Sequence, residues 1–138
     1  MAIHFFSEDI SFTLDKQDNT ISWIEKVMDK EGFSAENINY IFCSDNHLLA
    51  MNQQYLKHDT LTDIITFDHS EHSNNLEADI FISIERVEDN AKSLDKDFIN
   101  ELHRVIIHGL LHLIGLKDKT EAEKQEMREK EDACLSLR

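Results

Sequence analysis

The sequence predicts a single α+β domain, residues 1–138, in which helices pack on a mixed β-sheet of about four strands. Three observations support this fold class. The length suits one domain with a proper hydrophobic core. Short β-branched or alternating runs, typical of strands, are interspersed with longer runs whose apolar side chains recur at helical spacing. The C-terminal half carries mainly helical patterns, so a strand-rich first half closed by helices is expected.

Two strands and a helix are expected at the start of the chain. Residues 3–6 form a short apolar run, and residues 10–14 alternate apolar with polar side chains, as a strand with one buried face does. Capping side chains at 18–20 then begin a helix with apolar residues along one side. Gly32 ends that helix, because glycine adopts the left-handed backbone of a helix C-terminus without strain.

Strand patterns dominate the middle of the chain. Residues 38–43 are a compact apolar run, and residues 64–67 and 78–84 are rich in β-branched side chains, which favour strands. Capping residues directly after the first of these strands begin a helix whose apolar positions continue to Leu56. The polar stretch 68–77 is expected to connect the last two strands as a loop or hairpin.

Three helices are expected in the remainder. The first follows the last predicted strand and reaches about Leu94. The second begins near residues 95–96 and ends at Gly115, and its almost unbroken apolar stretch predicts burial on most sides. Thr120 and Glu123 form a capping box that begins a final, heavily charged helix. Apolar positions are sparse in that helix, so its acidic side chains are expected to face solvent.

Composition argues against several classes of function. The formal net charge of −14 is unsuited to a broad nucleic-acid surface, because affinity for phosphates comes from lysine and arginine. An RNA substrate would need a local basic patch, a metal or a partner. No apolar run approaches the length of a membrane span, so no membrane association is expected. Cys43 and Cys134 lack the spacing of a disulfide framework, and the first residues do not resemble a signal peptide, so a cytoplasmic location is predicted.

A metal site is predicted at the end of the long apolar helix. His108 and His112 are four residues apart and therefore share one helical face. Gly115 can turn the chain back, so that Asp118 supplies a third ligand. Two nitrogens and one carboxylate oxygen suit a single Zn²⁺ ion and leave a fourth position for water, as in catalytic sites. If the two histidines were instead buried core residues without a metal, each would need another hydrogen-bond partner. An unsatisfied buried polar group costs about 1–3 kcal/mol.

The spacing of these residues resembles the long zinc motif of the metzincin peptidases. Those enzymes carry a glutamate directly after the first histidine, where it serves as the general base. The corresponding residue here is Gly109, which has no side chain. Peptidase activity of that kind is therefore not expected, although a metal-dependent hydrolase is.

Three blocks resemble the bacterial YbeY family. Residues 108–115 match its pattern His-Gly-x-Leu-His-Leu-x-Gly, which the family continues with Tyr-Asp-His. Residues 51–67 are similar to Leu-Asn-x-x-Tyr-Arg-Gly-Lys-Asp-x-Pro-Thr-Asp-Val-Leu-Ser-Phe, and residues 78–83 to Gly-Asp-Ile-x-Ile-Ser. The blocks occur in the family's order and at its separations. The resemblance implies a zincin-like arrangement, with the metal-site helix in the C-terminal half.

The resemblance also implies a function. It predicts a zinc-dependent, single-strand-specific endoribonuclease that matures ribosomal RNA, notably the 16S rRNA 3′ end, and takes part in ribosome quality control. Its partners would be single-stranded rRNA precursors and the ribosome or ribosomal proteins. His108 and His112 match the family's first two metal ligands, and Asp118 stands where the family has its third histidine. A carboxylate remains a good Zn²⁺ ligand, so one zinc ion is expected.

One departure from the family pattern and one matching position leave alternatives open. Leu56 replaces the family's arginine, and Lys57 and His58 are candidates to supply the displaced positive charge at a catalytic site, unless they are only surface residues. Asp63 falls on a position that is either catalytic or a structural turn residue. A non-catalytic, metal-binding ribosome-assembly factor is therefore the alternative function, because the missing arginine and the strong acidity both favour it. The sequence does not determine the oligomeric state.

Overall fold

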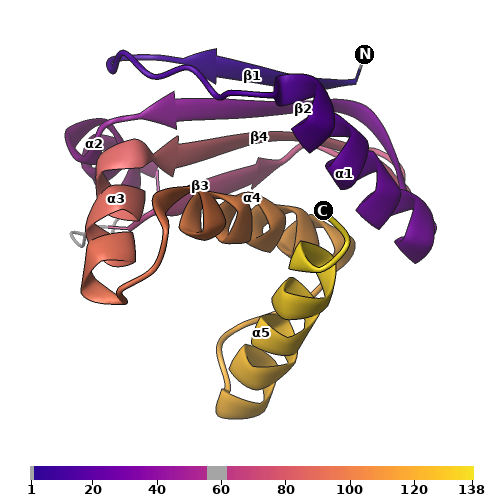
Figure 1. Cartoon of the computed structure of the whole chain (residues 1–138). Coiled ribbons are helices and arrows are strands. Elements are labelled where there is room, and N and C mark those ends of the chain that lie inside the picture. Colours follow the sequence, from indigo (N-terminus) through magenta and orange to yellow (C-terminus); the bar gives the residue numbers. More distant parts are fainter. Residues whose placement is uncertain (1, 56–61) are drawn as a thin grey trace.

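A computed structural model describes residues 2–55 and 62–138, and a four-stranded mixed sheet forms its centre (Figure 1). The strands are β1 (Ile3–Ser7), β2 (Ser34–Cys43), β3 (Ile64–Asp68) and β4 (Asn75–Ser83). They lie side by side in the order β1-β2-β4-β3. The first three in this order are parallel to one another, and β3 forms an antiparallel hairpin with β4. The predicted mixed sheet is therefore confirmed.

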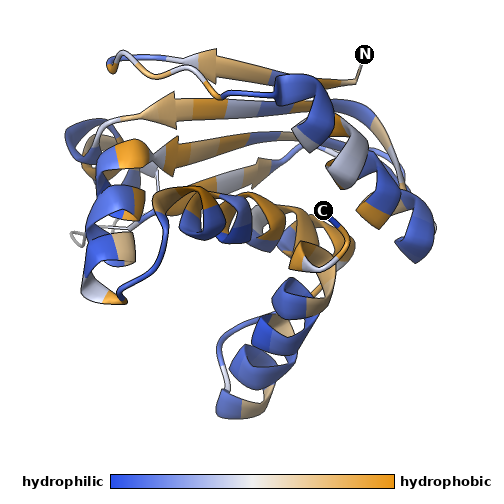
Figure 2. Ribbon diagram, viewed as in Figure 1, coloured by the Kyte–Doolittle hydropathy of each residue, from blue (hydrophilic) through white to orange (hydrophobic). Residues whose placement is uncertain are grey.

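The two central strands carry much of the core. Side chains alternate between the faces of a strand, so Ile38, Tyr40 and Phe42 of β2 point to the same side of the sheet. Ile80 and Ile82 of β4 lie in register with the last two of them. All five are at most 1% exposed. Figure 2 shows the corresponding apolar colouring along these strands.

Five helices surround the sheet in the described part of the chain. They are α1 (Gln17–Glu31), α2 (Asp45–Tyr55), α3 (Ile84–Ser93), α4 (Phe98–Ile114) and α5 (Glu121–Leu135). Gly32 and Gly115 end α1 and α4 as predicted, with left-handed φ angles of 80° and 119°. The capping box of Thr120 and Glu123 at the start of α5 is confirmed. None of the described helices is both long and apolar enough to cross a membrane.

The helices divide between the two faces of the sheet. α1 and α4 pack on the face that carries the main core, and the hydroxyl of Tyr40 donates a hydrogen bond to the carbonyl of Ile106, which ties α4 to β2. On the other face Leu48 of α2 packs with Cys43 and Ile65. α5 is mostly hydrophilic and lies against α4 (Figure 2). The metal-site helix therefore lies between the sheet and α5.

Gly109 allows α4 to lie close to the sheet. A Cβ atom at this position would come within 2.9 Å of Cδ1 of Ile64 and 3.3 Å of Cγ2 of Ile80. Position 109 thus faces β3 and β4, and a larger side chain there would force these strands or the helix to move. The glycine that distinguishes this chain from the peptidase motif is explained by packing.

The strand predicted over residues 10–14 is wrong. These residues have an irregular backbone, because no strand of the described sheet pairs with them. Their alternation is explained by contacts with the core: Leu14 is buried, and the ring of Phe12 packs edge-on against Phe42 and Phe98. Alternating apolar residues indicate that every second side chain is buried, whether or not the segment pairs with a neighbouring strand.

β4 begins at Asn75, inside the predicted loop 68–77, because its first residues pair with β2. Two other predicted boundaries also differ from the structure. α4 begins at Phe98 rather than at 95–96, because Asp95 has a left-handed φ of 54° and Asp97 serves as the N-cap residue. β2 begins at Ser34, earlier than predicted, because its polar first residues pair with the start of β4. None of these differences moves the predicted metal ligands.

Candidate metal centre

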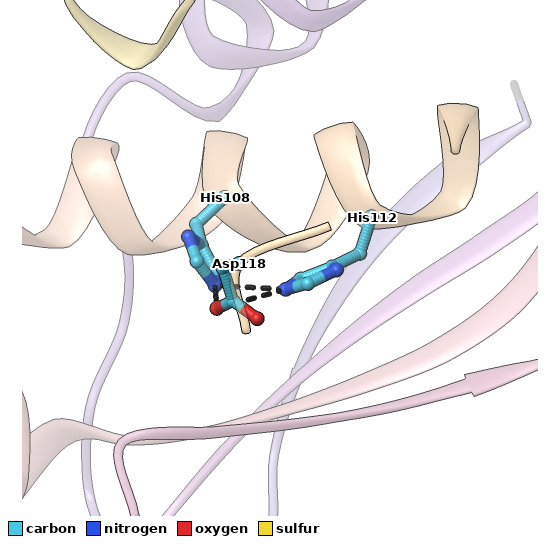
Figure 3. Close-up of side chains that lie close together, drawn as sticks. All are labelled: His108, His112 and Asp118. Atoms are coloured by element: carbon cyan, nitrogen blue, oxygen red, sulfur yellow. Dashed lines mark hydrogen bonds and ion pairs between the residues drawn. The ribbon is translucent and has the colours of Figure 1, made fainter. Parts of the chain in front are cut away.

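His108 and His112 lie one helical turn apart on α4, and their imidazoles converge with the carboxylate of Asp118 (Figure 3). The two Nε2 atoms are 3.0 Å apart, and Oδ2 of Asp118 is 3.3 Å from each of them. Among residues 2–55 and 62–138 this is the one group of histidine, cysteine or acidic side chains placed to hold an ion. All three side chains are partly exposed, so an ion can reach them from solvent.

The turn after α4 brings Asp118 into this group. The N–H groups of Gly115 and Leu116 both donate to the carbonyl of Leu111, which closes the helix end in the way that a left-handed glycine permits. The chain then reverses, and Asp118 returns beside the helical face that carries both histidines (Figure 3). The sequence prediction that the turn would place these three residues together is confirmed.

The arrangement fits a divalent metal ion. Nδ1 of His112 lies 3.0 Å from the carbonyl oxygen of Leu116, which only accepts hydrogen bonds, so Nδ1 carries the proton and Nε2 presents its lone pair. Ligands at 2.0–2.2 Å from a tetrahedral ion stand about 3.3–3.6 Å apart, close to the spacing found here. The donors therefore suit a cation in charge, number and spacing.

Glu131 of α5 contacts the first of these histidines. Its Oε2 lies 2.7 Å from Nδ1 of His108, and its Oε1 lies 2.8 Å from the guanidinium of Arg104. Burial alone would lower the pKa of His108, but the hydrogen bond and charge of Glu131 outweigh it and raise that pKa. Burial likewise acts to raise the pKa of Glu131, yet the hydrogen bonds from His108 and Arg104 leave it lowered.

The sequence prediction that the acids of the last helix face solvent is wrong for Glu131, which is only 6% exposed. The sequence does contain a pattern that indicates this burial. Met127 and Cys134 are also buried, and Glu131 lies between them on the same helical face, four residues after one and three before the other. An acid in the middle of an apolar face has to meet a partner.

A cavity of about 310 Å³ opens beside the candidate metal ligands, and several charged side chains line it. The lining residues are Asp63, Glu101, Arg104, Val105, His108, Asp118, Arg128 and Glu131. Asp63, which precedes β3, is partly buried, and this burial raises the pKa of its carboxyl group. The structure therefore places Asp63 at the site, while its backbone carbonyl also accepts a hydrogen bond from the N–H of Ser83.

The other candidate residues include some that the structure does not describe. Lys57 and His58, together with Leu56, lie outside the described residues, so their role stays a prediction. His103 lies one and a half turns before His108, and its ring contacts Trp23 and the guanidinium of Arg138 instead of the metal ligands.

A family model described as Endoribonuclease YbeY matches residues 3–137. The chain belongs to the YbeY family. It is 54% identical over 136 residues to the protein named Endoribonuclease YbeY from Cytophaga hutchinsonii, covering 99% of this chain and 95% of that one. The protein of the same name from Flavobacterium psychrophilum is 49% identical over 132 residues, covering 96% and 94%.

A solved structure also matches. The solution structure of a Thermotoga maritima protein has a TM-score of 0.69 and 27% identity to this chain, and the match covers 98% of this chain and 87% of that one. The YbeY resemblance predicted from three sequence blocks is confirmed, and so is the α+β fold class. The YbeY pattern quoted above has histidine at the third ligand position, and this YbeY chain places Asp118 there in contact distance of the other two.

Proposed function

We propose that this chain is a zinc-dependent endoribonuclease that cuts single-stranded RNA. The observation that carries the proposal is the convergence of His108, His112 and Asp118 in a chain whose relatives are named endoribonucleases. We infer that its substrates are ribosomal RNA precursors, with a role in 16S rRNA 3′-end maturation and ribosome quality control in the cytoplasm. Zn²⁺ is favoured over Mg²⁺ because imidazole nitrogens suit zinc, whereas magnesium takes oxygen ligands.

The proposed mechanism assigns separate tasks to the side chains around the site. His108, His112 and Asp118 would hold the ion. When bound, such an ion would polarise a phosphoryl oxygen and lower the pKa of an attacking water molecule. Position 109 offers no base, because it is a glycine that faces the sheet. Either the metal-activated water would act without a protein base or a base comes from another element, and Asp63 is a carboxyl group in the same cavity.

Asp63 is proposed as this general base. Replacing it by asparagine is expected to lower kcat by about 10²-fold and to leave the metal content unchanged. A positioned general base contributes about 10²–10⁴-fold to the rate. A base acts when deprotonated. Because burial raises the pKa of Asp63, the wild-type rate should rise with pH through that raised value and then level off. The pH profile of kcat measures this. An unchanged acidic limb in Asp63→Asn would contradict the assignment, and Asp89→Asn, an exposed acid of α3, is the control.

A cavity that adjoins the metal site is lined mainly by cations, which supports an RNA substrate despite the net charge of −14. Arg104 and Arg128 line the cavity that contains His108. The same two arginines also line a neighbouring cavity of about 330 Å³, together with Lys96 and Arg138. In this second cavity the cations outnumber the single acid Glu101, so it suits the phosphates of a bound strand that extends away from the ion.

Metal removal tests the proposed function. Purified protein is expected to cut a single-stranded RNA and to leave a duplex of the same sequence intact. A chelator should stop the cleavage, and added Zn²⁺ should restore it, because the ion supplies several kcal/mol of transition-state stabilisation. Cleavage that survives complete metal removal would contradict the mechanism. A metal-loaded protein that binds ribosomes without cutting RNA would favour the assembly-factor alternative, which the net negative charge supports.

A further inference from the structure

We propose that Glu131, held in place by Arg104, is a positioning residue that fixes His108 as a metal ligand and thereby makes the docked helix α5 part of the metal centre. The inference rests on the metal site of the proposed function. It assigns a task to a residue outside the ligand group, and it predicts that the ion and the last helix stabilise each other.

The contacts of Glu131 show that both of its carboxylate oxygens are committed. Oε2 lies 2.7 Å from Nδ1 of His108, and Oε1 lies 2.8 Å from Nη1 of Arg104. The other terminal nitrogen of Arg104 is 2.6 Å from Oδ1 of Asp132, the next residue on α5. The result is a chain of charge-assisted hydrogen bonds that runs from exposed Asp132 through the guanidinium and the buried carboxylate to the imidazole.

This chain of contacts determines which nitrogen of His108 can bind a metal. An ionised carboxylate only accepts hydrogen bonds, so Nδ1 of His108 must carry a proton to bond Glu131. In the neutral ring, which is the form that binds a metal, Nε2 then keeps its lone pair, and it is this atom that lies 3.3 Å from Asp118 and 3.0 Å from Nε2 of His112. The Leu116 carbonyl acts on His112 in the same way, so both rings are held in the tautomer that metal binding requires.

A purely structural role does not account for this placement. Burying a carboxylate is costly unless its partners compensate for the lost hydration. Arg104 already has a partner in Asp132, which is exposed and can hold it without Glu131. Of these two acids, only Glu131 accepts the hydrogen bond from Nδ1 of His108. Its side chain is 6% exposed and therefore has a well-defined position.

The placement of Glu131 on α5 couples that helix to the ion. α5 is amphipathic only weakly: Met127, Glu131 and Cys134 are its buried residues, and the indole N–H of Trp23 donates to the carbonyl of Cys134. One of three buried side chains thus serves the metal ligand. A ligand that binds only the folded form stabilises that form, so ion binding at His108 should stabilise the docked position of α5.

Zinc affinity of Glu131→Gln, measured by competition with a chromogenic chelator, tests the proposal. We expect the dissociation constant for Zn²⁺ to rise by about 10- to 100-fold, the usual cost of losing such an outer partner. Asp132→Asn is the matched control: it removes the same charge from the same arginine one residue away, and its zinc affinity should stay at the wild-type value. Arg104→Gln should give an intermediate loss, because Glu131 would keep its bond to His108 but lose its own support.

A second measurement separates positioning from general damage to the fold. In metal-free protein, ¹⁵N NMR of the imidazoles should show His108 protonated at Nδ1 in the wild type and in Asp132→Asn, and a mixture of tautomers in Glu131→Gln. Added Zn²⁺ should also raise the Tm of the wild type more than that of Glu131→Gln. If Glu131→Gln unfolds, the NMR and affinity comparison of Arg104→Gln with Asp132→Asn still decides the matter.

The outcomes distinguish this inference from the proposed function. Wild-type zinc affinity and an unchanged His108 tautomer in folded Glu131→Gln would overturn the positioning role alone. Equal affinity in Arg104→Gln and Asp132→Asn, with one His108 tautomer in both, would overturn the support by Arg104. A wild-type protein that binds no Zn²⁺ would overturn the metal site and this inference together.

Discussion

Replacing His112 by alanine is expected to abolish both stoichiometric zinc binding and RNA cleavage. The substitution leaves two of the three ligand groups, His108 and Asp118, and removes the imidazole whose Nε2 lies 3.0 Å from that of His108. A tetrahedral site with only two protein ligands cannot retain its ion against solvent or competing chelators. The ion's several kcal/mol of transition-state stabilisation is then lost, which corresponds to about 10³-fold or more in rate.

The fold should survive this change. The side chain of His112 is 33% exposed, and its bond to the Leu116 carbonyl lies at the end of α4 where water can replace it. Metal analysis of the purified variant, circular dichroism and an RNA cleavage assay should be made on the same preparation. His103→Ala, on the same helix and away from the ligands, is the control and should keep its zinc. Full cleavage by a metal-free His108→Ala/His112→Ala double variant would refute the metal mechanism.

Replacing Gly109 by glutamate is expected to destabilise the protein severely and to create no peptidase. The new Cβ would lie 2.9 Å from Cδ1 of Ile64 and 3.3 Å from Cγ2 of Ile80, and the carboxylate would be forced into this apolar contact. Overpacking costs about 1–3 kcal/mol. An unpaired buried charge adds about 3–5 kcal/mol. The total approaches the whole free energy of unfolding of a typical domain, about 5–15 kcal/mol.

Urea unfolding followed by circular dichroism measures this loss, and Gly109→Ala provides the graded comparison. Alanine gains about 1 kcal/mol in helix propensity over glycine but meets the same two isoleucines, so a smaller net loss is expected. Casein hydrolysis by any folded Gly109→Glu protein is the accompanying activity assay. A glutamate variant as stable as the wild type would show that α4 does not lie against β3 and β4 as described.

The sequence was sufficient to predict those features that are determined locally. His108, His112 and Asp118 lie within eleven residues, so helical periodicity and one glycine turn were enough to place them together. The capping box and both glycine helix ends were predictable for the same reason. Strand assignment was less secure: residues 10–14 have the alternation of a strand and no partner, because pairing depends on what lies beside the segment and not on its own side chains.

The less local parts of the site could be predicted only in part. Glu131 is one of many acids on a charged helix, and its burial depends on the angle at which α5 crosses α4. Asp63 precedes an edge strand, and its approach to the histidines follows from the packing of α4 on β3. The sequence could suggest that a base comes from elsewhere in the chain, but only the tertiary arrangement selects the segment.

The order of elements along the chain has a consequence for synthesis on the ribosome. Every strand of the described sheet precedes residue 84, whereas α4, which covers the main face of that sheet, ends at Ile114. The ribosome adds about 5–20 residues per second, so α4 is complete about 2–6 seconds after the last strand has been synthesised. The segment that arrives last to bury that apolar face also carries His108 and His112. The helix that shields the nascent chain from aggregation thus also supplies two of the three proposed metal ligands, and Asp118 follows four residues after its end.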